Sequence, residues 1–474
     1  MRARAVVLLA MTELWERFTY YGLRALLVLF LVAPIARGGL GLADASAASI
    51  YGLFAAGAYL CALPGGWLAD RYLGAVGAIW LGGGFIVAGN VVLVFAQPLA
   101  AFCTGLALIA VGVGLLKPNV TALVSLASAR ECMPPDSAFT LFYIGINIGA
   151  VGGPLVSAFL AAATGWRGGF AAAACGMLLG LAAFSQVAAD FGDRSAPRKA
   201  VGRALWTGAF VLVGIVVLAC WWIPVTLLLR AALVLVALTA IMGFTVLIRV
   251  AQPGLERRRV LLMMLLFCGA TVFWCAEEQA GVSLTLFAER FTDRHVLARD
   301  FPAAWYQSLY PLYVVLFAPF FVWAWQRLAQ LGREPSNILK FGAGLLVAAI
   351  GLGVATLAAI RAESAAAGSA VAMVGPVWLA MTYLLMALGE ILISPVGLAA
   401  GTQLSPAGRR GFSTGLWYLS LSLGGLAAGL FGGVFDFSRA RGLATAFGGI
   451  GLALAIGGAG FLLLGYRSRM GVQR

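Results

Sequence analysis

The chain has 474 residues, of which 62% are hydrophobic and only 11% are charged. Long apolar runs recur from end to end, which excludes a soluble globular domain and indicates a membrane protein of many helices. The net charge of +14 comes from basic residues scattered over short loops, without the dense basic face that nucleic-acid binding needs.

Fourteen apolar stretches are long enough to cross a bilayer and are predicted to be membrane helices. Lys and Arg residues concentrate in the loops on the side of both termini, so both termini are expected in the cytoplasm. The first run shows no small-residue cleavage site, and we expect no cleaved signal peptide. The predicted spans are 12–33, 46–69, 76–97, 99–125, 137–163, 167–189, 204–223, 225–248, 260–288, 305–328, 339–360, 371–402, 410–432 and 444–466.

The first predicted span carries an unusual number of charges. At about 100° per residue, five polar side chains share about one third of the helix circumference, namely Glu13, Glu16, Arg17, Tyr20 and Arg24. A charged side chain at mid-bilayer costs at least about 2.5 kcal/mol, so these charges need partners or water and a functional reason. A buried ion pair that only joins helices is the alternative interpretation.

The fourth and fifth spans also contain costly polar residues. Lys117 is the only lysine in the interior of a predicted span, since Lys340 stands at the cytoplasmic edge of the span 339–360, and Pro118 opens the helix ladder beside Lys117. A buried ammonium needs a carboxylate from the protein or from a substrate; extension to the cytoplasmic interface is the alternative. Asn147, between Gly145 and Gly149, either faces a cavity or bonds to a neighbouring helix.

Two features indicate how the spans are organised. Residues 190–259 are predicted to form a hairpin of two helices with polar ends, which we interpret as an insertion facing lipid. Its removal leaves six spans in 1–189 and six in 260–474, the arrangement of a two-bundle transporter with its substrate site between the halves. The segment Gly65-Gly-Trp-Leu-Ala-Asp-Arg-Tyr-Leu-Gly74 resembles the loop motif of the major facilitator superfamily.

The second half repeats the pattern of intramembrane charges. Glu277 and Glu278 are adjacent in the ninth span, so they cannot face the same way on a helix. Glu390 is the sole charge of the twelfth span, five residues before Pro395. Trp417 in the thirteenth span either packs in the core or lines a cavity.

Taken together, these motifs resemble the proton-dependent oligopeptide transporter family of the major facilitator superfamily, over almost the whole chain. The resemblance implies an all-α membrane protein with the major facilitator fold, built from two six-helix bundles and two extra helices between them. Bacterial family members carry such extra helices. The motifs that carry the resemblance are Glu13-x-x-Glu16-Arg17-Phe-x-Tyr20-Tyr21-Gly22, Lys117-Pro-Asn119, Phe139 to Gly149, Phe273-Trp-x-x-x-Glu-Gln279 and Gly389-Glu-Ile-Leu-Ile-Ser-Pro395.

The resemblance implies uptake of di- and tripeptides by proton symport in a bacterial-type inner membrane. Protons would be the coupling ion, and no other cofactor or metal is expected. The partners would be peptides, protons and the lipid bilayer, with no nucleic acid, and the protein would work as a monomer.

The resemblance also assigns roles to individual residues. Arg17 and Lys117 would hold the peptide carboxylate with Tyr21 nearby, while Asn147 and Glu390 would hold its ammonium end. The remaining substrate contacts would be Tyr20, Tyr59, Trp274, Tyr310, Ser394 and Trp417.

Proton coupling and gating are assigned to the charged residues. Glu13 and Glu16 would couple protonation to transport through Arg17, with Glu278 as a further coupling residue. Arg24 with Glu278 would close the extracellular side, and Lys117 with Glu390 the intracellular side. We hypothesise that the peptide carboxylate draws Arg17 from the glutamates, so that peptide and proton binding favour one another. The only histidine, His295, lies in a predicted external loop, so the relay is expected to use carboxylates.

Two features depart from the family pattern. Tyr310 stands where many members have Asn, and the segment Glu131-Cys-Met-Pro-Pro-Asp136 is less basic than is usual. The alternative within transport is a proton-coupled carrier of another small solute, an anion or a drug-like compound. A membrane enzyme is not expected, because the seven cysteines and one histidine show no metal spacing and no nucleophile–base pair appears. A receptor or scaffold would have little reason to keep five intramembrane glutamates.

Overall fold

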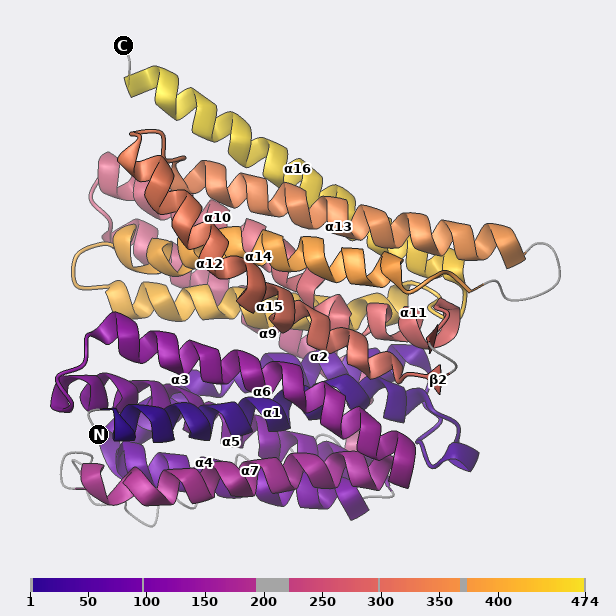
Figure 1. The fold of residues 1–474 in the computed structure, drawn as a ribbon. Helices are drawn as coiled ribbons and strands as arrows, with labels where there is room; N and C mark the ends of the chain where they lie inside the picture. The colour runs from indigo at the N-terminus through magenta and orange to yellow at the C-terminus, as the bar shows by residue number, and fades with distance from the viewer. Residues whose placement is uncertain (1–2, 96–97, 193–220, 297–298, 367–372, 473–474) are drawn as a thin grey trace. The chain divides into compact units, whose positions relative to one another are not determined.

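The structure of the chain is a computed structural model that describes residues 3–95, 98–192, 221–296, 299–366 and 373–472 (Figure 1). Within these residues the backbone is almost wholly helical, apart from a hairpin of β1 (His295–Val296) and β2 (Arg299–Asp300). The chain forms two compact units. The first comprises Met1–Ala43 and Leu53–Leu228, and the second comprises Asp44–Gly52 and Leu229–Arg474.

In the first unit, α1 packs along α6 and α7, and α4 packs along α5 (Figure 1). The elements of this unit are α1 (Arg4–Val32), η1 (Ile35–Arg37), the later part of α2 (Asp44–Leu60), α3 (Ala62–Leu68), η2 (Ala69–Leu73), α4 (Gly74–Phe95), α5 (Leu99–Arg130), α6 (Pro135–Thr164), α7 (Trp166–Ala188) and η3 (Ala189–Phe191).

In the second unit, α13 packs along α16 and α14, and α10 packs along α15. Its elements are the first part of α2, most of α9 (Val225–Val250), α10 (Leu255–Glu277), η4 (Glu278–Gly281), α11 (Ser283–Phe291), the β1–β2 hairpin, η5 (Ala303–Ser308), α12 (Leu309–Gln330), α13 (Asn337–Ala366), α14 (Val377–Gln403), α15 (Arg410–Val434) and α16 (Ala440–Val472).

Eleven stretches of the described residues are long and apolar enough to cross a membrane. One of them, Asp44–Phe95, covers two of the predicted spans. The charged helix α1 is not among the eleven, and the predicted span 204–223 lies largely outside the described residues. The prediction of fourteen spans is compatible with this arrangement, and the prediction of an all-helical membrane protein is confirmed.

Two predicted spans are interrupted, which corrects the sequence prediction. The span 46–69 divides at Cys61, because Pro64 has no N–H to donate to the Leu60 carbonyl, and it continues through α3 into the π-helical turn η2. The span 260–288 divides after Glu277 into η4 and α11. At this break the backbone of Gly281 meets the Tyr51 ring, where a Cβ would lie 2.2 Å from ring atoms.

Glycines at four-residue spacing bring α6 against α1. Gly145, Gly149 and Gly153 lie on one face of α6, and small residues let two helix backbones approach closely. A Cβ at Gly149 would lie 2.1 Å from the carbonyl oxygen of Leu14, and a Cβ at Gly153 would lie 2.4 Å from that of Phe18. The distance between α1 and α6 is therefore set by backbone contact.

Helix α7 holds another face of α1. The Thr19 hydroxyl donates a hydrogen bond of 2.7 Å to the Ala173 carbonyl, and the Phe18 ring packs against Gly176. Because α6 and α7 occupy these faces, the orientation of the charged side chains on α1 is fixed.

We predict that Gly149→Ala destabilises the protein by about 1–3 kcal/mol, because an added methyl group in a closed contact forces the helices apart. The matched control is Gly84→Ala in α4, since a Cβ at Gly84 meets no atom within 4 Å. Alanine in an open helical position should be neutral or should stabilise by about 0.5–1 kcal/mol. Thermal unfolding in detergent compares the two variants, and equal shifts in Tm would contradict the close packing of α1 and α6.

Candidate functional site

A buried ion cluster lies in the middle of α1. Glu13 and Glu16 are 0% exposed and Arg17 is 4% exposed. Arg17 donates two hydrogen bonds to Glu16, one from Nη2 to Oε1 at 2.7 Å and one from Nε to Oε2. Glu13 Oε1 lies 3.5 Å from Arg17 Nε, but neither oxygen of Glu13 accepts a hydrogen bond from the described residues. Within α1 one cation faces two carboxylates, and it compensates Glu16 better than Glu13.

Aromatic rings surround the cations of α1. The guanidinium carbon of Arg17 lies 4.9 Å from the centre of the Tyr20 ring and 6.0 Å from that of Tyr21. The Tyr20 ring stacks on Phe54 of α2 at 5.6 Å, and the guanidinium carbon of Arg24 lies 5.6 Å from the Tyr21 ring. These distances allow cation–π attraction. The predicted residues of the first span thus form one continuous surface.

Lys117 on α5 belongs to the same cluster. Its ammonium nitrogen lies 5.4 Å from the centre of the Tyr59 ring, and the charges of Glu13, Glu16 and Arg17 act on it. The side chain is half-buried. The structure therefore places Lys117 beside the α1 charges, which is the arrangement expected of a cationic site and not of a lysine extended to the interface.

Asn147 on α6 is buried, and its amide nitrogen donates 2.8 Å to the Tyr143 carbonyl of the same helix. The sequence left open a cavity-facing position or a bond to a neighbouring helix. The observed bond is instead within α6, so it does not join two helices.

The second unit groups a carboxylate with aromatic residues. Glu390 and Ser394 lie one turn apart on α14, and the Ser394 hydroxyl donates 3.2 Å to Glu390 Oε1. Gly397 follows on the same face at the spacing of two turns. The Trp417 ring packs directly on Gly397, where a Cβ would lie 1.8 Å from a ring atom. Glu390, Ser394 and Trp417 are therefore brought to one side of α14.

Trp274 joins this group through α15. A Cβ at Gly424 would lie 2.4 Å from Trp274 Cβ, and Gly424 follows Trp417 by two turns on the same face of α15. No described residue accepts a hydrogen bond from the buried Trp274 indole N–H. Tyr310 lies half-buried in the first turn of α12.

Glu278 has a partner that the sequence did not indicate. It starts η4, is buried, and accepts a hydrogen bond of 2.5 Å from the hydroxyl of Tyr51, which is itself fully buried. Tyr51 lies in an ordinary apolar stretch of α2, so the sequence alone carries no signal of this contact.

Two predicted gate pairs join residues of different units. Arg24 and Lys117 belong to the first unit, whereas Glu278 and Glu390 belong to the second. The structure describes each residue in its own unit, so the pairing of Arg24 with Glu278 and of Lys117 with Glu390 stays a prediction.

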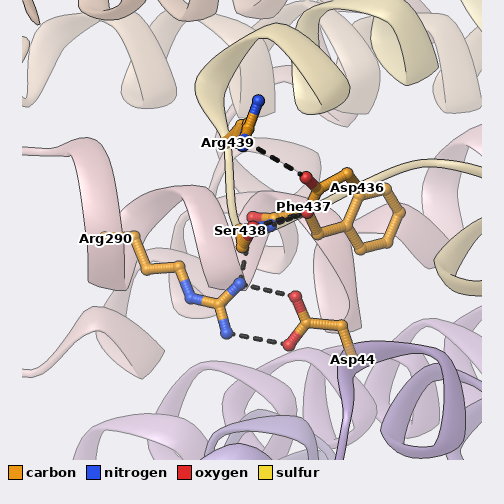
Figure 2. Close-up of polar contacts among 6 residues, drawn as sticks. All are labelled: Asp44, Arg290, Asp436, Phe437, Ser438 and Arg439. Carbon is orange, nitrogen blue, oxygen red and sulfur yellow. Dashed lines mark hydrogen bonds and ion pairs between the residues drawn. The ribbon is translucent and has the colours of Figure 1, made fainter.

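A second ion pair of the second unit was also missed (Figure 2). Arg290 at the end of α11 donates 2.7 Å and 2.8 Å bonds to the two carboxylate oxygens of Asp44 at the start of α2. Arg290 also donates 2.9 Å to the Phe437 carbonyl in the loop before α16. Asp44 and Arg290 are 18% and 27% exposed, so this bidentate pair is largely shielded from water. It ties the first turn of α2 to α11 and to the α15–α16 loop.

In the α15–α16 loop, Asp436 accepts hydrogen bonds from Ser438 of the same loop. Hydrogen bonds from the Ser438 hydroxyl and amide to Asp436 lower the pKa of that carboxyl, and the positive charges of Arg439 and Arg290 lower it further (Figure 2). Asp436 therefore stays charged to a lower pH than an ordinary aspartate. Among the residues that the structure describes, no group of three His, Cys, Asp or Glu side chains could hold a metal ion.

The fold and these charge clusters are those of a polytopic membrane transporter. A family model described as POT family matches residues 76–441, which is most of the chain. The chain is 38% identical to the peptide transporter YePEPT of Yersinia enterocolitica, over 96% of this chain and 92% of that protein. It is 32% identical to a di-/tripeptide transporter of Lactococcus lactis, over 88% of this chain and 86% of that protein.

Solved structures agree with the sequence comparisons. A crystal structure of peptide transporter POT in complex with sulfate matches with a TM-score of 0.86 and 32% identity, covering 98% of this chain and 94% of that chain. A POT family transporter in complex with 5-aminolevulinic acid matches with a TM-score of 0.85 and 27% identity, covering 98% and 96%. The chain therefore belongs to the POT family, and the predicted major facilitator fold is confirmed.

We predict a coupling free energy of about 1–2 kcal/mol between Asp44 and Arg290, because a bidentate, partly shielded ion pair is stronger than an exposed one. A double-mutant cycle of Asp44→Ala and Arg290→Ala, measured by thermal unfolding, determines this energy. The coupling should fall at high salt, and a combined Asp44→Arg and Arg290→Asp variant should recover part of it. Strictly additive single and double variants would show that the contact contributes nothing to stability.

Proposed function

We propose that this protein takes up di- and tripeptides together with protons, by alternating access between two bundles formed by 1–189 and 260–474. The curated relatives named above are peptide transporters, a class of carriers and not of enzymes. The observation that carries the proposal is the buried Glu13–Glu16–Arg17 cluster with Lys117 beside it. Ionisable residues inside membrane helices are rare and typically mark the pathway of an ion or a substrate.

In this proposal the cationic end of the site binds the peptide carboxylate. Arg17 and Lys117 supply two positive charges in a low-dielectric surrounding, where a charge-assisted hydrogen bond is strong. The rings of Tyr20, Tyr21 and Tyr59 line the same surface, so they exclude water and contact the peptide backbone and side chains. Because every peptide has a carboxylate, recognition at this end does not depend on sequence.

The anionic end is assigned to the second unit. Glu390, supported by Ser394, would receive the peptide ammonium, with Asn147 as a neutral partner from the first unit. Trp274 and Trp417 would contact the peptide side chains, and the unsatisfied indole N–H of Trp274 is available to a peptide carbonyl. Tyr310 would take the place of the Asn that many relatives have, where its larger ring shortens the space for the amino terminus.

Coupling follows from the shared cation. When the peptide carboxylate bonds to Arg17, the two buried carboxylates of Glu13 and Glu16 lose part of their compensation. Two buried carboxylates one turn apart repel each other, so a proton is then bound to the pair. Peptide binding therefore favours proton binding, and by linkage the reverse holds with the same free energy.

Movement between the two access states would depend on the charge pairs Arg24 with Glu278 and Lys117 with Glu390. The inserted segment 190–259, of which 193–220 lie outside the described residues, would face lipid. We further propose a bacterial-type inner membrane, a monomeric working state and cytoplasmic termini, because basic loops gather on the side of both termini. No cofactor besides the proton is needed for this cycle.

We predict that proteoliposomes containing the protein accumulate labelled dialanine under an inward proton gradient. Glu16→Gln should abolish accumulation while leaving exchange of labelled for unlabelled peptide, because the neutral side chain cannot release a proton. The control is Glu289→Gln, whose carboxylate makes an exposed pair with Arg294 worth little to stability or transport. Accumulation that does not depend on the proton gradient would contradict proton coupling. If no peptide moves under any condition, another small solute is favoured as the cargo.

We predict that Lys117→Gln raises the KM for dialanine by about 10-fold or more, because a hydrogen bond to a charged group contributes about 1.5–3 kcal/mol. Dialanine amide, which lacks the carboxylate, should compete poorly with dialanine in the unmodified protein. In Lys117→Gln the difference in competition between dialanine and dialanine amide should become smaller. If the amide and the free acid compete equally in the unmodified protein, Lys117 does not bind the peptide carboxylate.

A further inference from the structure

The cytoplasm-facing end assigned to α5 carries two adjacent, opposite charges that bond to two other helices. At the start of α1, Ala5 N–H donates 2.7 Å to Glu131 Oε1, and Val6 N–H donates 3.4 Å to Glu131 Oε2. Arg130 Nη1 donates 2.8 Å to the Asp190 carbonyl in η3, which follows α7. Arg130, the last residue of α5, therefore reaches the end of α7, and Glu131, which follows it, reaches the start of α1.

Each charge meets the helix end that it complements. The first N–H groups of a helix have no partner within it and carry a partial positive charge, whereas the last carbonyl groups carry a partial negative charge. The residue that precedes α1, Ala3, offers no side-chain cap, so Glu131 satisfies amides that α1 itself leaves open. Arg130 satisfies a carbonyl at the opposite kind of end.

The backbone after α5 is shaped so that it presents Glu131. Ser128 and Met133 close a turn by two hydrogen bonds, from Met133 N–H to the Ser128 carbonyl at 3.0 Å and from the Ser128 hydroxyl to the Met133 carbonyl at 2.8 Å. Inside this turn Cys132 has φ 52°, a left-handed conformation that costs a non-glycine residue about 1–2 kcal/mol per residue. The turn is therefore held in one conformation, although that conformation is intrinsically unfavourable.

We propose that Arg130 and Glu131 form a charge clamp that sets the position of α1 against α5 and thereby positions the ion cluster, with Glu131 as the main positioning residue. The proposal rests on the proposed transport function. The cluster on α1 begins about 12 Å from Ala5, and Lys117 lies about 21 Å from Glu131 along α5, at 1.5 Å per residue. Because α1 and α5 are continuous between these points, a contact at their ends fixes how Arg17 faces Lys117.

A slip of α1 by one residue shows why the clamp matters. Such a slip turns every side chain by about 100° and shifts it by about 1.5 Å. Arg17 would then leave the face that it shares with Lys117, and the cationic site would be divided. The glycine contacts with α6 and the Thr19 bond to α7 hold the middle of α1, and the clamp adds a fixed point at its first turn.

The test uses the full-length protein with three variants: Glu131→Ala, Glu131→Gln and a charge-swapped variant that combines Arg130→Glu with Glu131→Arg. The charge-swapped variant keeps the composition and the net charge, but it places at each helix end a charge of the wrong sign. The matched control is Glu363→Ala, because Glu363 Oε2 accepts the Arg441 amide at 3.2 Å near the start of α16, a helix without proposed site residues.

Hydrogen exchange of the first α1 amides measures the clamp without any peptide. Loss of a charged cap corresponds to about a fivefold change in the local opening equilibrium of a helix end. The first α1 amides of Glu131→Ala should therefore exchange about fivefold faster than those of the unmodified protein. Glu131→Gln keeps an acceptor oxygen, so its α1 amides should exchange at a rate between those of Glu131→Ala and the unmodified protein. In the charge-swapped variant the α1 amides should exchange at least as fast as in Glu131→Ala. Glu363→Ala should leave α1 unchanged.

Dialanine uptake into vesicles measures the consequence. The KM of Glu131→Ala and of the charge-swapped variant should rise about fivefold, while Vmax per folded protein is nearly kept. Glu131→Gln should restore most of the affinity. Unchanged α1 exchange, or a lower Vmax with an unchanged KM, would overturn the positioning role. If the unmodified protein moves no dialanine, the proposed function fails, and the exchange data alone then decide whether the clamp holds α1.

Discussion

The structure depends on the compensation of charge inside a helix that lies in an apolar surrounding. Glu13, Glu16 and Arg17 are almost entirely buried on α1, where each charge costs at least about 2.5 kcal/mol without a partner. One arginine serves two carboxylates, and the bidentate bonds go to Glu16. Lys117 adds a second positive charge, but Glu13 accepts no hydrogen bond from the described residues, so its compensation is incomplete. The cluster is therefore responsive, because a substrate anion and a proton each change the same balance.

The packing around α1 keeps this balance from relaxing. Glycines of α6 place its backbone against α1, and a hydroxyl bond from Thr19 reaches α7. The remaining surface carries the charges and the rings of Tyr20 and Tyr21. A helix that could rotate would turn Arg17 away from this face, so the packing of α1 keeps Arg17 beside Tyr20, Tyr21 and the carboxylates.

The sequence predicted what depends on composition and on the cost of burial. Apolar length located the helices, and the cost of intramembrane charge was enough to single out Glu13, Glu16, Arg17, Lys117 and Glu390. It could not predict contacts between residues far apart in the chain. Tyr51 with Glu278, Asp44 with Arg290 and Glu131 with α1 join positions separated by more than a hundred residues, and none shows a local pattern. The helix breaks at Cys61 and after Glu277 were missed because mean apolarity continues through them.

The central claim is that peptide and proton cross together through the α1 cluster. The most direct test records the internal pH of sealed vesicles when dialanine is added outside, with equal pH on both sides and the membrane potential clamped at zero. We expect internal acidification that saturates with peptide concentration and is absent in Glu16→Gln. Entry of labelled dialanine without any change in internal pH would contradict it.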